Sequence, residues 1–139
     1  MLRKFLFLTN CLNKSNSMGK KITVAKAKKL QKKWWDTRSI VTTNGKQHED
    51  TCQFHFTVEE LQAYLDEVKT KSQGLDTPGI NIWFGAYDAT ATAPSLATVF
   101  LAPTKKVKSD DPDMEYEHVA NDDIEPFNHG SGLWPPGEY

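Results

Sequence analysis

Residues 80–102, INIWFGAYDATATAPSLATVFLA, decide the fold of this chain. Apolar side chains take every second position at the start of the stretch, at Ile80, Ile82, Phe84 and Ala86. This alternation predicts a strand over residues 80–87, and Gly85 within it indicates a bulge or a close neighbour. Residues 96–102 predict a second strand, which Pro103 is expected to stop. The two runs therefore predict an antiparallel hairpin with an eight-residue loop, residues 88–95.

The segment before this hairpin predicts an amphipathic helix with a defined start. Thr57 and Glu60 have the spacing of a capping box, in which each side chain bonds the backbone N–H of the other residue. Gly74 is suited to the end of the helix, because glycine adopts the left-handed conformation found there. One face of the helix collects the apolar side chains of Val58, Leu61, Tyr64, Leu65 and Val68.

Residues 24–35 predict a first helix, with Thr23 as its N-cap. Its apolar stripe includes Leu30 and Trp34, and residues 36–39 are expected to end it. The opposite arc carries five lysines, Lys26, Lys28, Lys29, Lys32 and Lys33. Between the helices, Asn44-Gly45 is a strong turn signal that follows a possible short strand at residues 40–43.

Size and composition limit the classes of protein that this chain can belong to. With 139 residues, 38% of them hydrophobic and 25% charged, it suits one small globular domain. Its apolar runs are all shorter than the roughly 18 residues that span a bilayer, so a membrane-embedded protein is excluded. Two cysteines are too few for the disulfide framework of a small secreted scaffold.

Charge is distributed unevenly along the chain. Residues 1–46 hold 12 Lys or Arg and one acid, whereas residues 47–139 hold 5 Lys or Arg and 17 acids. Nine of these acids lie in residues 109–139. Such asymmetry is typical of a nucleic-acid-binding arm, of an acidic interaction tail, or of two ends that pair with each other.

Three segments are expected. Residues 1–19 are predicted to be an extension or a disordered tail, with Met1 and Met18 both open as the translation start. The apolar run of residues 5–8 is too short for a secretory signal, so we expect a cytoplasmic protein, with a truncated export signal as the alternative. Residues 20–108 are predicted to form the core, and residues 109–139, rich in acids, proline and aromatic side chains, to wrap it.

Three motifs together resemble a group of small bacterial proteins. They are residues 54–65 (FHFTVEELQAYL), residues 79–87 (GINIWFGAY) and residues 98–104 (TVFLAPT), and Pro135-Pro136 resembles the double proline at the end of that group. Some of those proteins have a cysteine before the two prolines, where this chain has Trp134. The resemblance supports the expected order of elements and implies no activity.

Residues that suggest chemistry do not form a complete site. His48, Cys52 and His55 lack the regular spacing of about four ligands that zinc requires. The acidic run of residues 110–117 lacks the glycine and the final glutamate of a calcium loop. Neither a nucleophile elbow nor a phosphate-binding glycine loop is present in the sequence. We therefore predict no catalytic residue, metal site or cofactor, and an enzyme is the less favoured class.

The sequence as a whole predicts an α+β domain in which two helices pack on a small, mainly antiparallel sheet. The hypothesis for function is a non-catalytic protein-interaction module that uses Trp83 and Tyr87 on the outward face of a strand. A homodimer through a sheet edge is a further hypothesis. The alternative is nucleic-acid binding through the five lysines. The predicted core is Leu30, Trp34, Phe56, Leu61, Leu65, Val68, Ile80, Ile82, Phe84, Val99 and Leu101.

Overall fold

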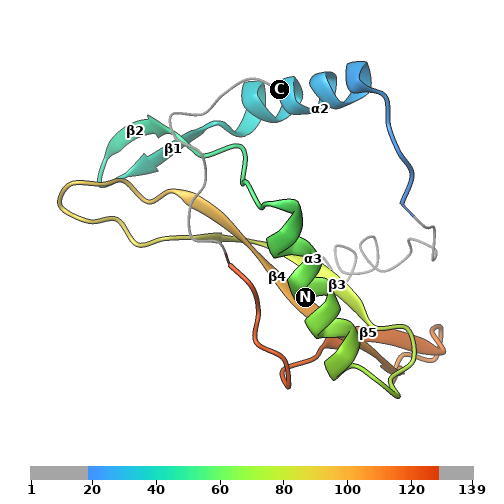
Figure 1. The fold of residues 1–139 in the computed structure, drawn as a ribbon. Coiled ribbons are helices and arrows are strands. Elements are labelled where there is room, and N and C mark those ends of the chain that lie inside the picture. Colours follow the sequence, from blue (N-terminus) through green and yellow to red (C-terminus); the bar gives the residue numbers. More distant parts are fainter. Residues whose placement is uncertain (1–18, 129–139) are drawn as a thin grey trace.

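The computed structural model describes residues 19–128 of the chain (Figure 1). The elements follow the order α2 (Val24–Arg38), β1 (Ile40–Thr43), β2 (Lys46–Glu49), α3 (Val58–Lys71), β3 (Gly79–Ala86), β4 (Ala97–Lys108) and β5 (Tyr116–Ala120). Strands β1 and β2 form one antiparallel sheet, and β3, β4 and β5 form a second in that order. The predicted α+β class is confirmed. The alternative start sites at Met1 and Met18, and residues 129–139 of the predicted wrapping segment, lie outside the described residues.

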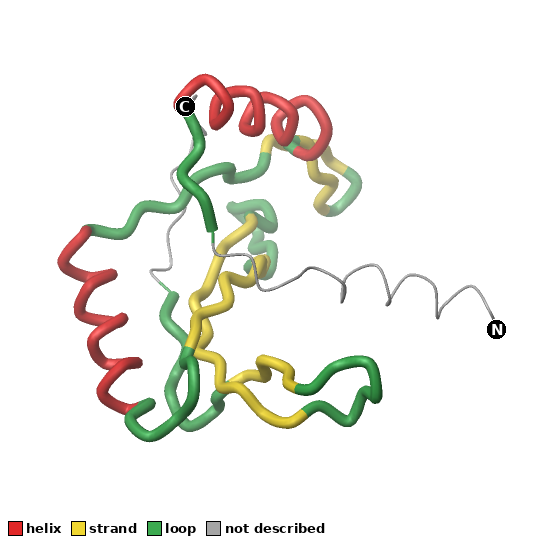
Figure 2. Tube along the Cα trace, turned by 90° about the vertical axis from the view of Figure 1, so that its right-hand side faces the viewer, coloured by secondary structure: helices red, strands yellow, loops and turns green. Residues whose placement is uncertain are grey.

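Helix α3 covers one face of the three-stranded sheet (Figure 2). Its capping box forms as predicted: Thr57 Oγ1 accepts from the Glu60 N–H at 3.1 Å, and the Glu60 carboxylate accepts from the Thr57 N–H at 2.9 Å. Inward-facing Tyr64 and Val68 then pack on Leu101 of β4 and on Ile124. The Tyr64 ring stacks on Phe127 at a centroid distance of 5.0 Å. This cluster is the hydrophobic core of the described residues.

Strand β4 runs through Pro103, so the prediction that this proline stops the strand is wrong. The ladder with β3 continues past it, with Pro103 opposite Ile80 and Thr104 opposite Gly79. The backbone carbonyl of Pro103 accepts from the Asn121 N–H at 2.9 Å, which places the hydrogen-bonding side of residue 103 away from β3. Proline therefore removes no β3–β4 hydrogen bond at this position.

A third strand, β5, joins the sheet where the sequence predicts only a wrapping segment. Residues 116–120 pair with residues 104–108 of β4, and the cation of Lys106 lies 4.3 Å from the centre of the Tyr116 ring. Further along the same edge of β4, Leu101 exchanges both of its backbone hydrogen bonds with Phe127, at 2.9 Å each. The chain after β5 thus continues along the edge of β4 that lies opposite β3.

The small β1–β2 hairpin has the tight turn that Asn44-Gly45 predicts. Both turn residues have positive φ, 51° and 75°, and Thr43 pairs directly with Lys46. Two side chains, one on β2 and one directly after it, then attach this hairpin to the start of β4 and to the loop before it. The Asp50 carboxylate accepts from the Ala97 N–H at 2.7 Å, and His48 Nε2 lies 3.1 Å from the Ser95 carbonyl.

Helix α2 is longer than predicted and ends at Arg38, not at Trp35. The last turn holds because Lys32 pairs with Asp36 at 2.6 Å and the Thr37 hydroxyl donates to the Lys33 carbonyl. The helix contributes no fully buried side chain, and Leu30, predicted to lie in the core, is 55% exposed. In Figure 1, α2 lies beside the β1–β2 hairpin, far from β5.

The predicted core is correct around α3 and wrong at the middle of β3. Val68 and Leu101 are buried, and Phe56, Leu61 and Ile80 pack against them. Trp34, Leu65 and Val99 are half-buried. Ile82 and Phe84 are exposed, because α3 covers β4 and leaves the neighbouring part of β3 open.

Candidate functional site

The outer edge of β3 carries no strand among the residues that the structure describes. Leu101 directs its backbone groups to Phe127, so Leu101 and Ile82 form a pair without mutual hydrogen bonds. Since backbone direction alternates along a strand, Ile82 and its even-numbered neighbours direct their N–H and C=O groups away from β4. These residues are Ile80, Ile82, Phe84 and Ala86. The edge is a row of donors and acceptors that suits pairing with another extended chain.

Large apolar side chains stand on this edge. Ile82 is 68% exposed, Trp83 50% and Phe84 79%, although Leu101, directly opposite Ile82, is buried. Three consecutive exposed side chains of this size on one strand are uncommon in a protein without a partner. We call Ile82, Trp83, Phe84 and the outward backbone of residues 80–86 the β3 edge surface.

Trp83 lies on the face of the sheet that α3 does not cover. Its ring is stacked on that of Phe100, with centroids 6.5 Å apart and planes inclined by 13°. Gly85 allows the strands to approach here, because a Cβ at this position would lie 3.3 Å from Thr98 Cγ2. The predicted close neighbour of Gly85 is therefore Thr98, and the register continues through it without a bulge.

Tyr87 follows β3 and is held by hydrogen bonds. Its hydroxyl donates to Asn128 Oδ1 at 3.1 Å and accepts from the Thr98 hydroxyl at 3.3 Å. The Asn128 amide lies 3.4 Å from the same threonine oxygen. The ring is still 41% exposed, so Tyr87 presents an apolar surface while its polar end is fixed.

A hollow of about 240 Å³ adjoins Phe84. Its walls come from α2, from the segment between β2 and α3, and from β3. The residues are Gln31, Trp34, Thr51, Cys52, Phe54 and Phe84. The lining is mainly apolar and aromatic, which suits a side chain of an added strand. The structure thus brings Trp34 and Phe84 together beside the β3 edge surface, a relationship that the sequence does not predict.

The five lysines of α2 remain on the surface. Lys26, Lys28, Lys29, Lys32 and Lys33 are all exposed. Among the ion pairs of residues 19–128, Lys32–Asp36 is the one formed by a side chain of α2. Within these residues, no ion pair joins α2 to the acidic segment after β4. Trp34 and Trp35, beside these lysines, are half-buried. The lysine face of α2 is therefore a concentrated positive surface.

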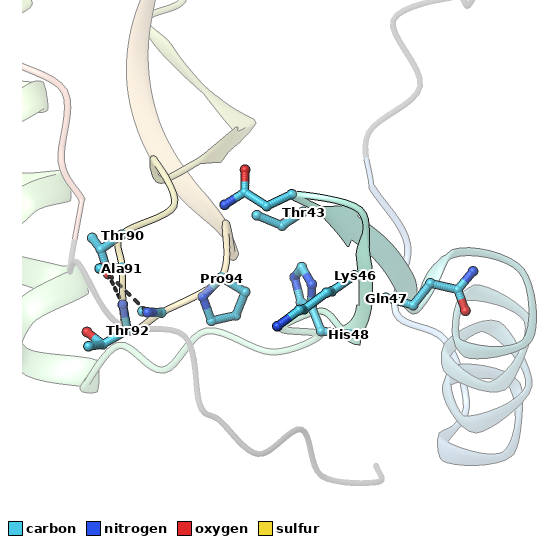
Figure 3. Close-up of a pocket in the computed structure, with 10 residues that line it drawn as sticks. Thr43, Lys46, Gln47, His48, Thr90, Ala91, Thr92 and Pro94 are labelled. Carbon is cyan, nitrogen blue, oxygen red and sulfur yellow. Dashed lines mark hydrogen bonds between the residues drawn. The ribbon is translucent and has the colours of Figure 1, made fainter.

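A second hollow, of about 360 Å³, lies between the β1–β2 hairpin and the loop before β4 (Figure 3). His48 faces it, with Thr90, Thr92 and Pro94 on the other side. The described residues that line it include no carboxylate or thiol, and the His48 ring already bonds the Ser95 carbonyl. Across residues 19–128, no three His, Cys, Asp or Glu side chains gather as metal ligands do. The lining of this hollow therefore combines no carboxylate or thiol nucleophile with a base.

Comparison with known proteins gives no relative: no family model, curated protein or solved structure matches this chain. The resemblance to small bacterial proteins stays a prediction. Neither α2 nor α3 has the length and apolar character of a membrane span, a finding limited to the described part of the chain.

Sequence reasoning places Trp83 and Tyr87 on the surface but assigns Ile82 and Phe84 to the core. The signal for the edge is present in residues 80–84, where apolar side chains occupy both faces of the strand. A strand of a three-stranded sheet with one helix on it has little protein to cover both faces. The roles of Asp50 and Ile124 have no such signal, because they depend on long-range contacts.

Proposed function

We propose that this protein is a non-catalytic interaction module that binds an extended segment of a partner protein by strand addition at β3. The observation that carries the proposal is the β3 edge surface, which combines backbone groups that no strand of residues 19–128 pairs with and the exposed side chains of Ile82, Trp83 and Phe84. In strand addition, backbone hydrogen bonds provide affinity and pockets for alternate side chains provide specificity. The hollow beside Phe84 is suited to be such a pocket for a side chain of the added strand.

Trp83, within the β3 edge surface, and Tyr87, directly after β3, act as the aromatic anchors. Tryptophan and tyrosine are enriched among residues that dominate binding energy. The stacking of Trp83 on Phe100 and the fixed hydroxyl of Tyr87 limit the entropy that these rings lose when a partner covers them.

A proline substitution tests strand addition without disturbing the fold. The Ile82 N–H points away from β4, so Ile82→Pro removes one outward donor and no β3–β4 hydrogen bond. The matched variant Ile82→Ala keeps this N–H donor and removes the side chain beyond Cβ, so comparing the two variants separates the hydrogen bond from the side chain. We expect affinity capture from the source cells to lose the partner with Ile82→Pro, Trp83→Ala and Tyr87→Ala, and to keep it with Val58→Lys on exposed α3. Retention of every partner by all three β3-edge variants would refute the proposal.

The lysine face of α2 supports a second candidate function, nucleic-acid binding. Five exposed lysines on one helix attract phosphate groups, and few local carboxylates neutralise them. We expect binding to generic RNA or DNA that weakens steeply with salt. Replacing Lys29, Lys32 and Lys33 together with glutamine is expected to weaken binding further, and absence of binding by the unaltered protein at low salt removes this candidate.

A further inference from the structure

We infer that the partner at β3 is a second copy of this chain, paired antiparallel through the same edge about a two-fold axis at Trp83. This inference rests on the proposed strand addition at β3 and names its occupant. An isologous dimer uses one surface twice, so the surface must be complementary to itself in shape, hydrogen bonding and charge. Each of these requirements can be examined on β3.

Backbone geometry favours the register that pairs all four outward residues of β3 with one another. Among the described residues of β3, those that direct their backbone groups across the outer edge are Ile80, Ile82, Phe84 and Ala86. With the axis at Trp83, Ile82 lies opposite Phe84 of the partner and Ile80 lies opposite Ala86 of the partner, so every outward residue forms a hydrogen-bonded pair. An axis at Ile82 leaves Ala86 opposite Pro78, which has no N–H. The register centred on Trp83 therefore uses the edge fully.

Charge does not oppose this pairing. The strand and its flanks from residue 77 to residue 87 contain no charged side chain. In the register centred on Trp83, Asp88 lies opposite Pro78 and Asp76 opposite Thr90, so no two acids face each other. Edge strands of monomeric proteins ordinarily carry lysine, proline or an inward-pointing charge that prevents self-pairing, and the interior of β3 has none of these.

The exposed side chains are covered in such a dimer. Ile82 of each copy lies beside Phe84 of the other, between the two α3 helices on one face of a continuous sheet. This position explains why Ile82 is open although Leu101, its neighbour on β4, is buried under α3. On the opposite face, the two Trp83 rings meet at the axis, each already stacked on its own Phe100.

Analytical ultracentrifugation of the full chain over a range of concentrations tests the inference. We expect a dimer that dissociates on dilution. Because the symmetry repeats each change, Ile82→Pro removes two interfacial donors and is expected to weaken self-association about 30-fold. Phe84→Lys, at a site too exposed to matter for folding, is expected to abolish it, while Val58→Lys leaves it unchanged.

Cross-linking locates the axis. In a chain whose Cys11 and Cys52 are replaced by serine, Trp83→Cys weakens the dimer by removing the ring but brings two thiols together at the axis, so at high protein concentration we expect oxidation to trap the dimer as an intermolecular disulfide. Asn81→Cys, on the same face of β3, faces Gly85 of the other copy and is expected to form none. Rapid cross-linking of Asn81→Cys in place of Trp83→Cys would contradict the register.

The outcomes separate this inference from the proposed function. A chain that stays monomeric at every concentration, or a dimer that is insensitive to Ile82→Pro and Phe84→Lys, overturns the second copy as the occupant. If the monomeric chain captures another protein and Ile82→Pro abolishes that capture, strand addition at β3 stands with a different protein as partner. Loss of self-association in both β3 variants, with unchanged unfolding curves, supports the inference.

Discussion

Trp83 of β3 and Phe100 of β4 lie directly opposite each other in the ladder, with their rings stacked at 6.5 Å. This pair forms an aromatic surface, exposed at Trp83 and half-buried at Phe100, on the face of the sheet that α3 leaves open. Beside it, Ile82 and Phe84 extend the same surface around the edge of β3. The arrangement is the physical basis of the proposed protein-interaction role, because it joins apolar area to backbone groups that no described strand pairs with.

Removal of the Trp83 ring is expected to affect binding more than folding. Trp83→Ala loses one aromatic pair on an exposed face, for which we expect a decrease of about 1 kcal/mol in the free energy of unfolding. We expect at least a tenfold loss of affinity for the partner, since an interfacial tryptophan commonly contributes more than 1.4 kcal/mol. Urea unfolding and a binding titration measure the two effects. Tyr116→Ala, at an equally exposed ring on β5, is the control and is expected to leave binding intact.

The Asp50 carboxylate is expected to hold the β1–β2 hairpin on β4. It accepts from the backbone N–H groups of Thr51 and Ala97, at 2.8 and 2.7 Å. Asp50→Ala leaves the N–H groups of buried Thr51 and half-buried Ala97 without this acceptor, and we expect a loss of about 2 kcal/mol in unfolding free energy. Asp50→Asn keeps an acceptor oxygen and is expected to lose about half as much. Equal stability of Asp50→Ala and the exposed variant Asp88→Ala would argue against this role.

The hydroxyl of Tyr64 connects α3 to two backbone carbonyls in the core. It lies 3.2 Å from the Leu101 oxygen and 3.0 Å from the Glu125 oxygen. We expect Tyr64→Phe to lower the unfolding free energy by about 1 kcal/mol, which thermal or urea unfolding can measure. A Tyr64→Phe protein as stable as the original would show that these carbonyls find other donors.

Alkaline pH gives a separate test of the same side chain. Burial, with a smaller contribution from the Glu67 carboxylate, raises the pKa of Tyr64 above its ordinary value of 10.0. The unfolded chain therefore releases this proton first, and the contribution to stability is lost as pH rises from the unfolded pKa through the folded one. We expect Tyr64→Phe to flatten the alkaline decline in unfolding free energy. An identical decline in both proteins would contradict the raised pKa.

Acid pH is expected to weaken the contact between β4 and the turn that precedes β3. Lys106 donates to Asp76 at 3.0 Å, and this hydrogen bond, with the charge of Lys106, lowers the pKa of Asp76. The stabilisation is complete above the ordinary carboxyl pKa and is lost as pH falls through the lowered value. Because the pair is exposed, the effect is small. We expect Asp76→Asn to reduce the slope of stability against pH in the acid range, whereas an unchanged slope counts against the pair.

Local features of the fold follow from the sequence because short-range chemistry determines them. The capping box at Thr57 and Glu60 fixes the start of α3, and Asn44-Gly45 fixes the β1–β2 turn through its positive φ angles. The order of the helices and of strands β3 and β4 follows from hydrophobic periodicity in the same way. Trp83 was also predictable as a surface residue from its position in the alternation.

Some features of a segment depend on which other segment of the chain pairs with it or packs against it. These features do not follow from the sequence of the segment alone. Pro103 lies within β4 because its missing N–H faces Asn121 and not β3, a fact that only the register reveals. Ile82 and Phe84 have the periodicity of buried residues, yet their exposure depends on where α3 ends over the sheet. Residues 116–120 show little alternation, and they become a strand because β4 is long enough to pair with them.

Amide hydrogen exchange, resolved by residue along β3, tests the role of this edge most directly. In the dilute protein, the outward amides of Ile80, Ile82, Phe84 and Ala86 should exchange rapidly, while Asn81, Trp83 and Gly85, bonded to β4, exchange slowly. Binding of the partner, or concentration if the partner is a second copy, should slow the outward set and leave the inward set unchanged. Outward amides that are already slow in the dilute monomer, or that stay fast in the complex, would contradict strand addition at β3.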